Sequence, residues 1–238
     1  MAESSKRPVA VITGVGPGLG AALARRFAQG YAIAIVARNA GYLRSLKQEI
    51  EVSAAAVLEA PADLGDREQV AAAFKLIREQ LGAPDLLVYN AGSGKWGTLL
   101  EISPEEFEDA WRVNAYGAFL AAREVVPGML ARGHGAILFT GATAGVKAGP
   151  KSAAFGPAKF AMRGLAQSMA RDLGPKGIHV AWINVDGLID IPGRKIPNLK
   201  SDDLLDPAAI AETYWHLAHQ HPSAWTMELD VRPFKEKF

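Results

Sequence analysis

The stretch Thr13–Gly20, which reads TGVGPGLG, follows the apolar run Val9–Thr13 and precedes a helical pattern. Glycines in such a turn allow the backbone to bend tightly and to approach a pyrophosphate, which the amide groups and dipole of a helix N-terminus stabilise. A glycine-rich turn alone is weak evidence, but its place between the first strand and the first helix favours cofactor binding over a plain tight turn. The residues expected to bind are Gly14, Gly16, Gly18, Leu19 and Gly20.

Around this turn, short apolar runs rich in β-branched residues alternate with helical patterns. The expected strands are Val9–Thr13, Ala32–Ala37, Leu86–Asn90, Ala136–Thr140 and Val180–Asn184, with a weaker strand at Ala55–Glu59. The expected helices are Gly20–Gln29, Gly41–Val52, Arg67–Leu81, Pro104–Ala131, Ser152–Leu173 and Pro207–His219. This alternation predicts an α/β fold: one domain over residues 1–238, with a doubly wound parallel sheet (Rossmann fold), helices on both faces, and a short substrate loop near 188–206.

The composition argues against several classes of function. The 238 residues carry a formal net charge of only +1, which is unlike a nucleic-acid or membrane-surface binder. No cysteine is present, and the five histidines show no metal-ligand spacing with acidic residues. The first residues are polar, and no run of about 18 apolar residues follows. We therefore expect a cytoplasmic protein that acts on a small-molecule substrate, with no metal, nucleic-acid or membrane partner.

Further motifs follow the glycine-rich turn in a fixed order. They are Asp63 and Leu64, then Asn90, Ala91 and Gly92 after the fourth strand, Asn114 in the long helix, and Lys159 in the next helix. Together with Thr13–Gly20, these residues resemble the fingerprint of the short-chain dehydrogenase/reductase family, from Val9 to about Val231. The resemblance implies that Asp63 and Leu64 contact adenine. It also implies that Asn90, Ala91, Gly92 and Gly187 contribute to the cofactor site.

The end of the second strand bears on the choice of cofactor. An acidic side chain there accepts a hydrogen bond from a ribose hydroxyl of NAD(H), whereas an arginine pairs with the 2′-phosphate of NADP(H). This chain has Ala37 where NAD-preferring family members carry aspartate, followed by Arg38 and Asn39. Arg38 could also be a solvated surface charge, and Pro17 stands where many NADP-binding members carry a second basic residue. The pattern favours NADP(H) over NAD(H), with Arg38 and Asn39 among the contacts.

Two catalytic positions depart from the family pattern. In the family a tyrosine donates the proton, a lysine lowers the tyrosine pKa and holds the ribose, a serine binds the carbonyl, and a helical asparagine anchors a relay water. Asn114 and Lys159 keep two of these four residues, but Phe155 occupies the tyrosine position and Ala142 the serine position. Losing the acid should cost about 10²–10⁴-fold, and losing the hydrogen-bond donor about 10²–10³-fold. We still expect Ala142 and Phe155 to face the substrate.

Other side chains near these positions could supply a proton. Thr140 and Thr143 flank the serine position, and Lys151 and Ser152 precede the tyrosine position, where Ser152 also fits a helix N-cap. Structural or solvated roles explain these four residues more simply. Lys159 is the better candidate donor, although gripping the nicotinamide ribose would explain it equally well.

Two loops at the expected ligand edge complete the candidate site. Asp186 and Gly187 stand where the family has a Pro-Gly turn near the nicotinamide. Asp186 fits either a turn residue or a contact to the carboxamide or the substrate. Lys95 and Trp96 follow the fourth strand and are expected to touch substrate, because open α/β sheets bind ligands at the carboxyl ends of their strands.

Two functions fit these patterns. The first is an NADP(H)-dependent oxidoreductase with non-standard proton delivery, acting on a substrate such as an activated double bond or a strongly polarised carbonyl. The alternative is a non-catalytic NADP(H)-binding sensor or assembly protein, a pseudoenzyme that binds cofactor without turnover. In either case the helices Pro104–Ala131 and Ser152–Leu173 are apolar on more than one face. Because family members pair these helices between subunits, we expect a homodimer or homotetramer.

Overall fold

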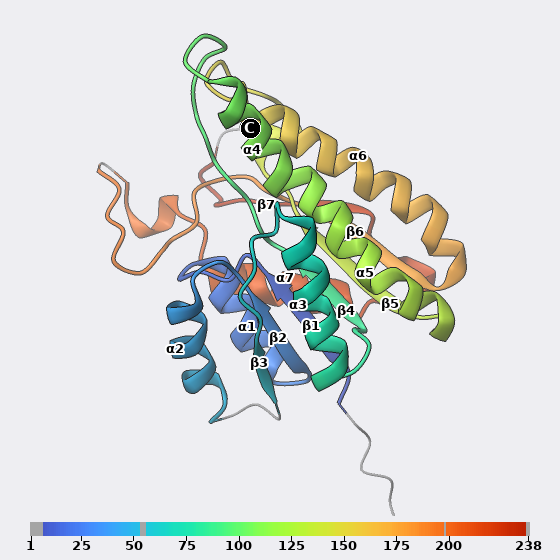
Figure 1. The fold of residues 1–238 in the computed structure, drawn as a ribbon. Helices are drawn as coiled ribbons and strands as arrows, with labels where there is room; N and C mark the ends of the chain where they lie inside the picture. Colours follow the sequence, from blue (N-terminus) through green and yellow to red (C-terminus); the bar gives the residue numbers. More distant parts are fainter. Residues whose placement is uncertain (1–6, 53–55, 198, 237–238) are drawn as a thin grey trace, which may run out of the picture.

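The computed structural model describes residues 7–52, 56–197 and 199–236. Within them lies a sheet of seven parallel strands in the order β3-β2-β1-β4-β5-β6-β7 (Figure 1). The strands are β1 (Val9–Thr13), β2 (Ala32–Val36), β3 (Val57–Glu59), β4 (Leu86–Tyr89), β5 (Gly135–Thr140), β6 (Ile178–Val185) and β7 (Glu228–Val231). The chain runs outward from β1 to β3, returns to place β4 on the other side of β1, and continues outward from there. This order confirms the doubly wound sheet.

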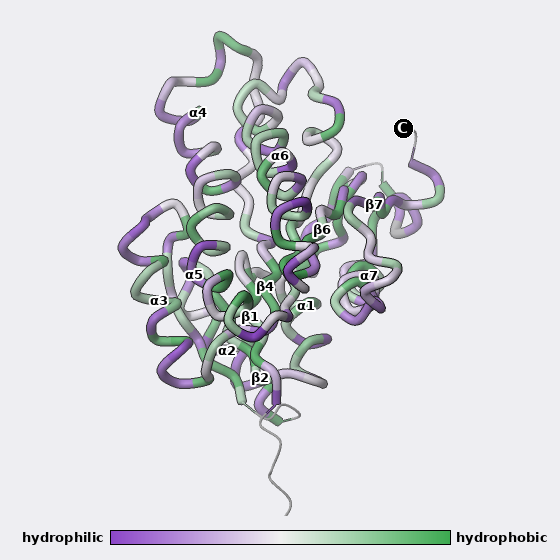
Figure 2. Tube along the Cα trace, turned by 90° about the vertical axis from the view of Figure 1, so that its right-hand side faces the viewer, coloured by the Kyte–Doolittle hydropathy of each residue, from purple (hydrophilic) through white to green (hydrophobic). Residues whose placement is uncertain are grey.

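Helices cover both faces of the sheet, and each face has its own apolar core. The helices are α1 (Leu19–Ala28), α2 (Ala40–Ile50), α3 (Arg67–Gln80), α4 (Pro104–Trp111), α5 (Gly117–Arg132), α6 (Phe155–Leu173) and α7 (Pro207–Ala218). Residues of α1, α2 and α7 share one core, and residues of α3, α5 and α6 share the other. Figure 2 shows the central strands in hydrophobic green, with most hydrophilic stretches on the helices and loops around them. Short 3-10 segments are η2 (Thr143–Gly145), η3 (Gly174–Lys176), η4 (Ser201–Asp203) and η5 (Pro222–Ala224).

The seventh strand was not predicted. β7 reads ELDV and lies beside β6 at the edge of the sheet, where its residues are exposed or only partly buried. Glu228 accepts hydrogen bonds from Arg163, and Asp230 pairs with Arg232. An edge strand that carries charges lacks the continuous apolar run that marks the inner strands. The weak strand expected at Ala55–Glu59 is confirmed only over Val57–Glu59, and Ala55 lies outside the described residues.

The long helix expected at Pro104–Ala131 is interrupted by a π-helical turn, η1 (Arg112–Tyr116). The extra residue in such a turn displaces the backbone locally, and such turns occur frequently at functional sites. Asn114 sits in the middle of η1 and is fully buried. Gly117 follows, and a Cβ there would collide with the Leu64 carbonyl and the Tyr89 hydroxyl, so the backbone directly after the turn packs where no larger side chain fits.

The helix expected from Ser152 begins later, at Phe155. Ser152 is therefore not its N-cap: the Ser152 hydroxyl donates to the carbonyl of Gly149 at 2.7 Å, inside the preceding loop. The residue that precedes the helix is Ala154, whose side chain offers no cap. Among the described residues, no helix combines the length and apolar character needed to cross a membrane.

Candidate functional site

A cleft of about 880 Å³ opens at the carboxyl edge of the sheet. Its walls come from the glycine-rich turn, the ends of β4, β5 and β6, the start of α6, and the segment after β6. The lining residues are Gly14, Gly16, Pro17, Gly18, Leu19, Gly20, Asn90, Gly92, Gly94, Trp96, Thr140, Gly141, Ala142, Thr143, Ala144, Lys147, Phe155, Lys159, Val185, Asp186, Gly187, Leu188, Ile189, Ile191, Arg194 and Glu236. The structure thus brings together, in one cleft, candidate residues that lie far apart in sequence.

The glycine-rich turn has the shape expected for binding a phosphate. Gly14 has φ +66°, and a Cβ there would lie 2.5 Å from the backbone of Ala91, so no larger residue fits. A Cβ on Gly20 would likewise meet the Gly14 carbonyl, whereas Gly16 faces open space. Leu19 begins α1 directly after the turn, which directs the helix N-terminus and its amides toward the cleft. Backbone and dipole at this point favour a bound anion.

A chain of hydrogen bonds holds the turn in place. The Tyr214 hydroxyl donates to Thr140 Oγ1 at 2.8 Å, and Thr140 Oγ1 donates to Asn90 Oδ1 at 3.1 Å. Asn90 Nδ2 in turn donates to the Gly14 carbonyl at 3.1 Å. Burial raises the pKa of Tyr214, so its hydroxyl stays protonated and acts as the first donor. Asn90 is thereby a structural support for the turn as well as a wall of the cleft.

Lys159 is a buried ammonium without a counter-charge. Its side chain lies on α6 and is only 4% exposed, and Lys159 Nζ donates to the Thr140 carbonyl at 2.9 Å. No acidic side chain among the described residues lies within ion-pair distance of it. Burial in this cleft lowers the pKa of Lys159 to about 7. At neutral pH the amine can therefore both hold and release a proton.

Asn114 lies behind the cleft wall, next to Lys159. Asn114 Nδ2 donates to the carbonyls of Ala110 at 2.8 Å and Ser93 at 3.1 Å, while Asn114 Oδ1 is buried with no hydrogen-bond partner in the described part of the chain. A Cβ on Gly92 would lie 3.2 Å from Asn114 Oδ1 and 3.4 Å from Lys159 Nζ. Asn114 Oδ1 and Lys159 Nζ therefore lie near the same point beside Gly92. A hydrogen-bond donor at that point would satisfy Asn114 Oδ1.

The substrate end of the cleft is aromatic and has no hydroxyl at the two replaced positions. The Phe155 ring packs on Trp96 with centroids 5.2 Å apart, and Lys159 Nζ lies 5.5 Å from the centre of the Phe155 ring. Ala142 presents only a methyl group to the cleft. Nearby, the Thr143 hydroxyl donates to Asp186 Oδ1 at 2.5 Å, so its proton is not directed at a substrate. Asp186 is 2% exposed, which excludes a purely solvated turn residue.

The residues expected around adenosine lie outside this cleft lining, at the ends of β2 and β3. Arg38 is exposed, and Asn39 caps α2 by accepting a hydrogen bond from the Tyr42 amide. Asp63 Oδ1 accepts from the Gly65 amide, and Leu64 is buried. The structure therefore assigns local structural contacts to Asn39 and Asp63, and leaves the Arg38 side chain in solvent at the edge of the sheet.

Several lining residues were missed from the sequence, and one candidate points elsewhere. Lys147, Arg194 and Glu236 line the cleft but sit in segments without helical or strand periodicity. In the sequence, only proximity to the family motifs could have indicated that these three residues line the cleft. Lys95, expected to touch substrate, is absent from the lining and forms an ion pair with Glu106 at 2.7 Å.

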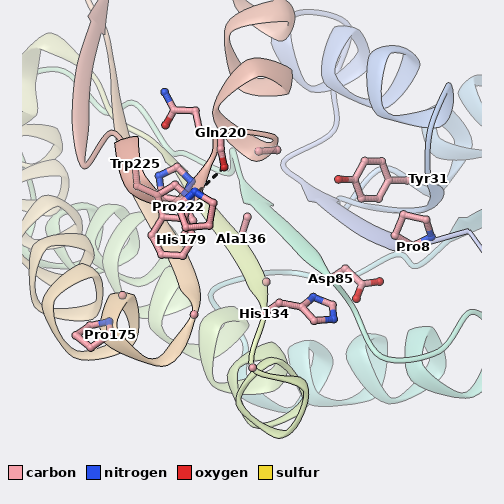
Figure 3. Close-up of a pocket in the computed structure, with 15 residues that line it drawn as sticks. Pro8, Tyr31, Asp85, His134, Ala136, Pro175, His179, Gln220, Pro222 and Trp225 are labelled. Atoms are coloured by element: carbon pink, nitrogen blue, oxygen red, sulfur yellow. Dashed lines mark hydrogen bonds between the residues drawn. The ribbon is translucent and has the colours of Figure 1, made fainter.

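A second pocket, of about 640 Å³, lies at the opposite, amino edge of the sheet (Figure 3). It is walled by residues that begin strands or follow helices: Pro8, Tyr31, Asp85, Gly133, His134, Gly135, Ala136, Gly174, Pro175, Gly177, His179, Ala218, Gln220, Pro222 and Trp225. The C-terminal ends of helices at this edge carry negative partial charge, and the Asp85 carboxylate is paired with Arg132 at 3.3 Å, so nothing here resembles the helix N-terminus that favours a phosphate in the first cleft. No group of histidine and acidic side chains in the described ranges could hold a metal.

Comparisons with known proteins agree on one family. The family model described as short chain dehydrogenase matches residues 8–190. A solved short-chain dehydrogenase from Rhodopseudomonas palustris has 36% identity and a TM-score of 0.83, covering 95% of this chain and 98% of its own. L-sorbose reductase from Gluconobacter frateurii, solved with NADPH and L-sorbose, has 27% identity and a TM-score of 0.87, covering 98% of both chains. Glycine betaine reductase ATRR from Emericella nidulans is 29% identical over 238 residues, covering 96% of this chain, which spans only 19% of that longer protein.

The unpaired Lys159 ammonium predicts a signed pH effect on stability. An unfolded lysine has a pKa near 10.4, so between about pH 7 and pH 10 the unfolded chain binds a proton that the folded chain lacks. The cost of burying the charge is therefore full below pH 7 and is relieved as the pH rises. Lys159→Met should stabilise the cofactor-free protein by about 1–4 kcal/mol at pH 6–7, and this gain should shrink toward pH 10.

Urea unfolding at several pH values measures this difference. Lys151→Met, at an exposed position in the loop before α6, is the matched control and should show no pH-dependent gain. A Lys159→Met variant that is less stable at every pH, or whose difference from the parent does not change with pH, would contradict the burial argument.

Proposed function

Because this chain belongs to the short chain dehydrogenase family and is therefore an oxidoreductase, we propose that it binds NADP(H) along the carboxyl edge of its sheet. The observation that carries the proposal is the glycine-rich turn: Gly14 and Gly20 leave no room for a Cβ, Gly16 faces open space, and α1 begins at Leu19. A structural relative solved with NADPH supports the same cofactor. When bound, the cofactor supplies the hydride that is exchanged with a small-molecule substrate.

Most of the residues proposed to hold the cofactor line the cleft, and those at the adenosine end lie beyond its lining, after β2 and β3. The contacts are Gly14, Gly16, Gly18, Leu19 and Gly20 at the pyrophosphate, Arg38, Asn39, Asp63 and Leu64 at the adenosine end, and Asn90, Ala91, Gly92, Lys159 and Gly187 at the nicotinamide end. We propose that the chain forms one domain and that the segment near 188–206 is its substrate loop. Figure 1 shows the described part of this segment, in orange, extending from the body of the fold after β6.

Proton delivery in this site differs from that of a serine and tyrosine pair. We propose that Lys159 supplies the proton, because it lines the cleft and burial brings its pKa to about 7. Asn114 orients that end of the site through its unpartnered Oδ1 beside Gly92. A single ammonium polarises a substrate carbonyl less than a tyrosine acid and a serine hydrogen-bond donor acting together. A substrate that is already polarised, such as an enone or an activated carbonyl, fits best.

An enzyme is favoured over a cofactor sensor. The missing hydroxyls at Ala142 and Phe155 would fit a protein that only binds NADP(H). However, the similar proteins are named as dehydrogenases and reductases, and Lys159 and Asn114 remain in contact with the cleft or its wall. Titration with NADPH followed by a screen of carbonyl and enone substrates distinguishes turnover from binding alone.

Cofactor preference should depend on Arg38. If its guanidinium pairs with the 2′-phosphate, NADPH should bind more tightly than NADH, and Arg38→Ala should remove about 1.5–3 kcal/mol of that preference. Dissociation constants from fluorescence titration measure it. Arg44→Ala is the control, since Arg44 is also exposed on α2 but pairs loosely with Glu59 at 3.9 Å. Equal affinities for the two cofactors, or a ratio unchanged in Arg38→Ala, would refute the proposed contact.

Restoring the two lost donors should raise carbonyl reduction. In the double variant Phe155→Tyr with Ala142→Ser, the new phenol lies one helical turn from Lys159, which stabilises its phenolate. We expect a gain of about 10²-fold or more in kcat/KM on a broad carbonyl panel. Each single variant serves as a control, because either donor alone should give less. No gain in a folded double variant that binds NADPH would show that the missing donors are not what limits reduction.

We propose that two copies of the chain associate through α4, α5 and α6. Trp111, Tyr116 and Phe119 form a continuous ring stack with centroids 5.6 and 6.5 Å apart, and Trp111 and Phe119 are 42% and 39% exposed. Exposed aromatic surface of this kind is stabilised by burial against a partner. Sedimentation at micromolar protein should give a dimer or tetramer, and Trp111→Asp should shift it toward monomer. Val52→Asp, at a 90% exposed site after α2, should not.

A further inference from the structure

Asp186 is a buried carboxylate that is only partly satisfied. It follows β6 directly, lines the cleft, and is 2% exposed. Asp186 Oδ1 accepts a hydrogen bond from the Thr143 hydroxyl at 2.5 Å, but Oδ2 has no hydrogen-bond partner among the described residues. The guanidinium of Arg232 lies 3.5 Å from Oδ2. Burying a carboxylate with so few donors costs free energy, so a compensating role for its charge is expected.

The charge of Asp186 is not fully neutralised by Arg232. The same guanidinium also binds Asp230, whose Oδ2 lies 2.7 Å from Arg232 Nη2. One guanidinium therefore contacts two carboxylates, and it lies closer to Asp230 than to Asp186. Asp230 is 45% exposed on its side chain and does not line the cleft, so water screens it. Of the two carboxylates, Asp186 is the one that lines the cleft.

The sheet topology places Asp186 in the nicotinamide half of the site. A dinucleotide lies across the point where the strand order reverses, here between β1 and β4. The adenosine half lies toward β2 and β3, where Arg38 and Asp63 stand. The other half of the cofactor must then lie over the ends of β4, β5 and β6, where Thr143, Lys159 and Asp186 line the cleft.

We infer that the Asp186 carboxylate favours the oxidised cofactor over the reduced one, and so makes bound NADPH a stronger hydride donor. This inference rests on the proposed NADP(H) site. Loss of a hydride leaves the nicotinamide ring with one positive charge, whereas the reduced ring is neutral. A fixed negative charge nearby stabilises the charged form alone. The substrate receives the hydride and a proton from another group, so Asp186 transfers neither and acts through its charge.

The test compares affinities for the two redox forms rather than activity. Dissociation constants of NADP⁺ and NADPH are measured by titration calorimetry for the parent and for Asp186→Asn. The variant should weaken NADP⁺ relative to NADPH by about tenfold, which corresponds to a shift of about 30 mV in the potential of the bound cofactor. Asp172→Asn removes one carboxylate charge at the exposed far end of α6, outside the cleft and paired with Lys176 rather than Arg232, and its affinity ratio should stay within about twofold of the parent.

The ratio of the NADP⁺ and NADPH dissociation constants distinguishes an effect of the Asp186 charge from an effect of Asp186 on the shape of the site. If Asp186→Asn weakens both forms equally, the residue only shapes the site and the inference is wrong; an unchanged ratio overturns it as well. Should Asp186→Asn unfold, Asp186→Ser keeps a hydroxyl toward Thr143 and should show the same shift. If the folded parent binds neither NADP⁺ nor NADPH, the proposed cofactor fails first, and this outcome is distinct from an unchanged ratio.

Discussion

A sheet in which all strands run the same way places every strand's carboxyl end at one edge. The helices that connect such strands begin at that edge, so their N-terminal amides and positive dipole ends gather there as well. In this protein the glycine-rich turn, the ends of β4 to β6 and the start of α6 therefore meet at one cleft. The amino edge collects helix C-termini and forms the second pocket.

Within that cleft two ionisable side chains are buried, and the roles that we propose for them depend on this burial. Lys159 has one carbonyl as a partner and no acid, so its pKa falls to about 7. Asp186 has one hydroxyl and a shared arginine. Neither charge is placed where it maximises the stability of the cofactor-free fold. Both are placed where a charged ligand, or charge that develops during hydride transfer, would interact with them.

Much of the fold could be predicted from the sequence because the inner strands are buried on both faces and read as continuous apolar runs. β7 could not, since an edge strand with Glu228 and Asp230 has no such run. The π-helical turn around Asn114 was also hidden, because Arg112–Tyr116 lies within one continuous helical pattern and the close packing of Gly117 against Leu64 and Tyr89 is visible only in the structure. In the site, the family motifs located Gly14 and Lys159. The cleft positions of Lys147, Arg194 and Glu236 depend on where aperiodic segments fold back.

The hydrogen-bond chain from Tyr214 through Thr140 and Asn90 to Gly14 runs along the carboxyl edge of the sheet, from the end of β5 to the glycine-rich turn after β1. Its first donor belongs to α7, whose core is on the face opposite α6. The same Thr140 offers its carbonyl to Lys159. Consider a chimera in which the glycine-rich turn and α6 are moved into another protein whose own last helix is kept. This chimera would lose the Tyr214 hydroxyl that donates to Thr140. The last helix should travel with the site as part of a single exchangeable unit.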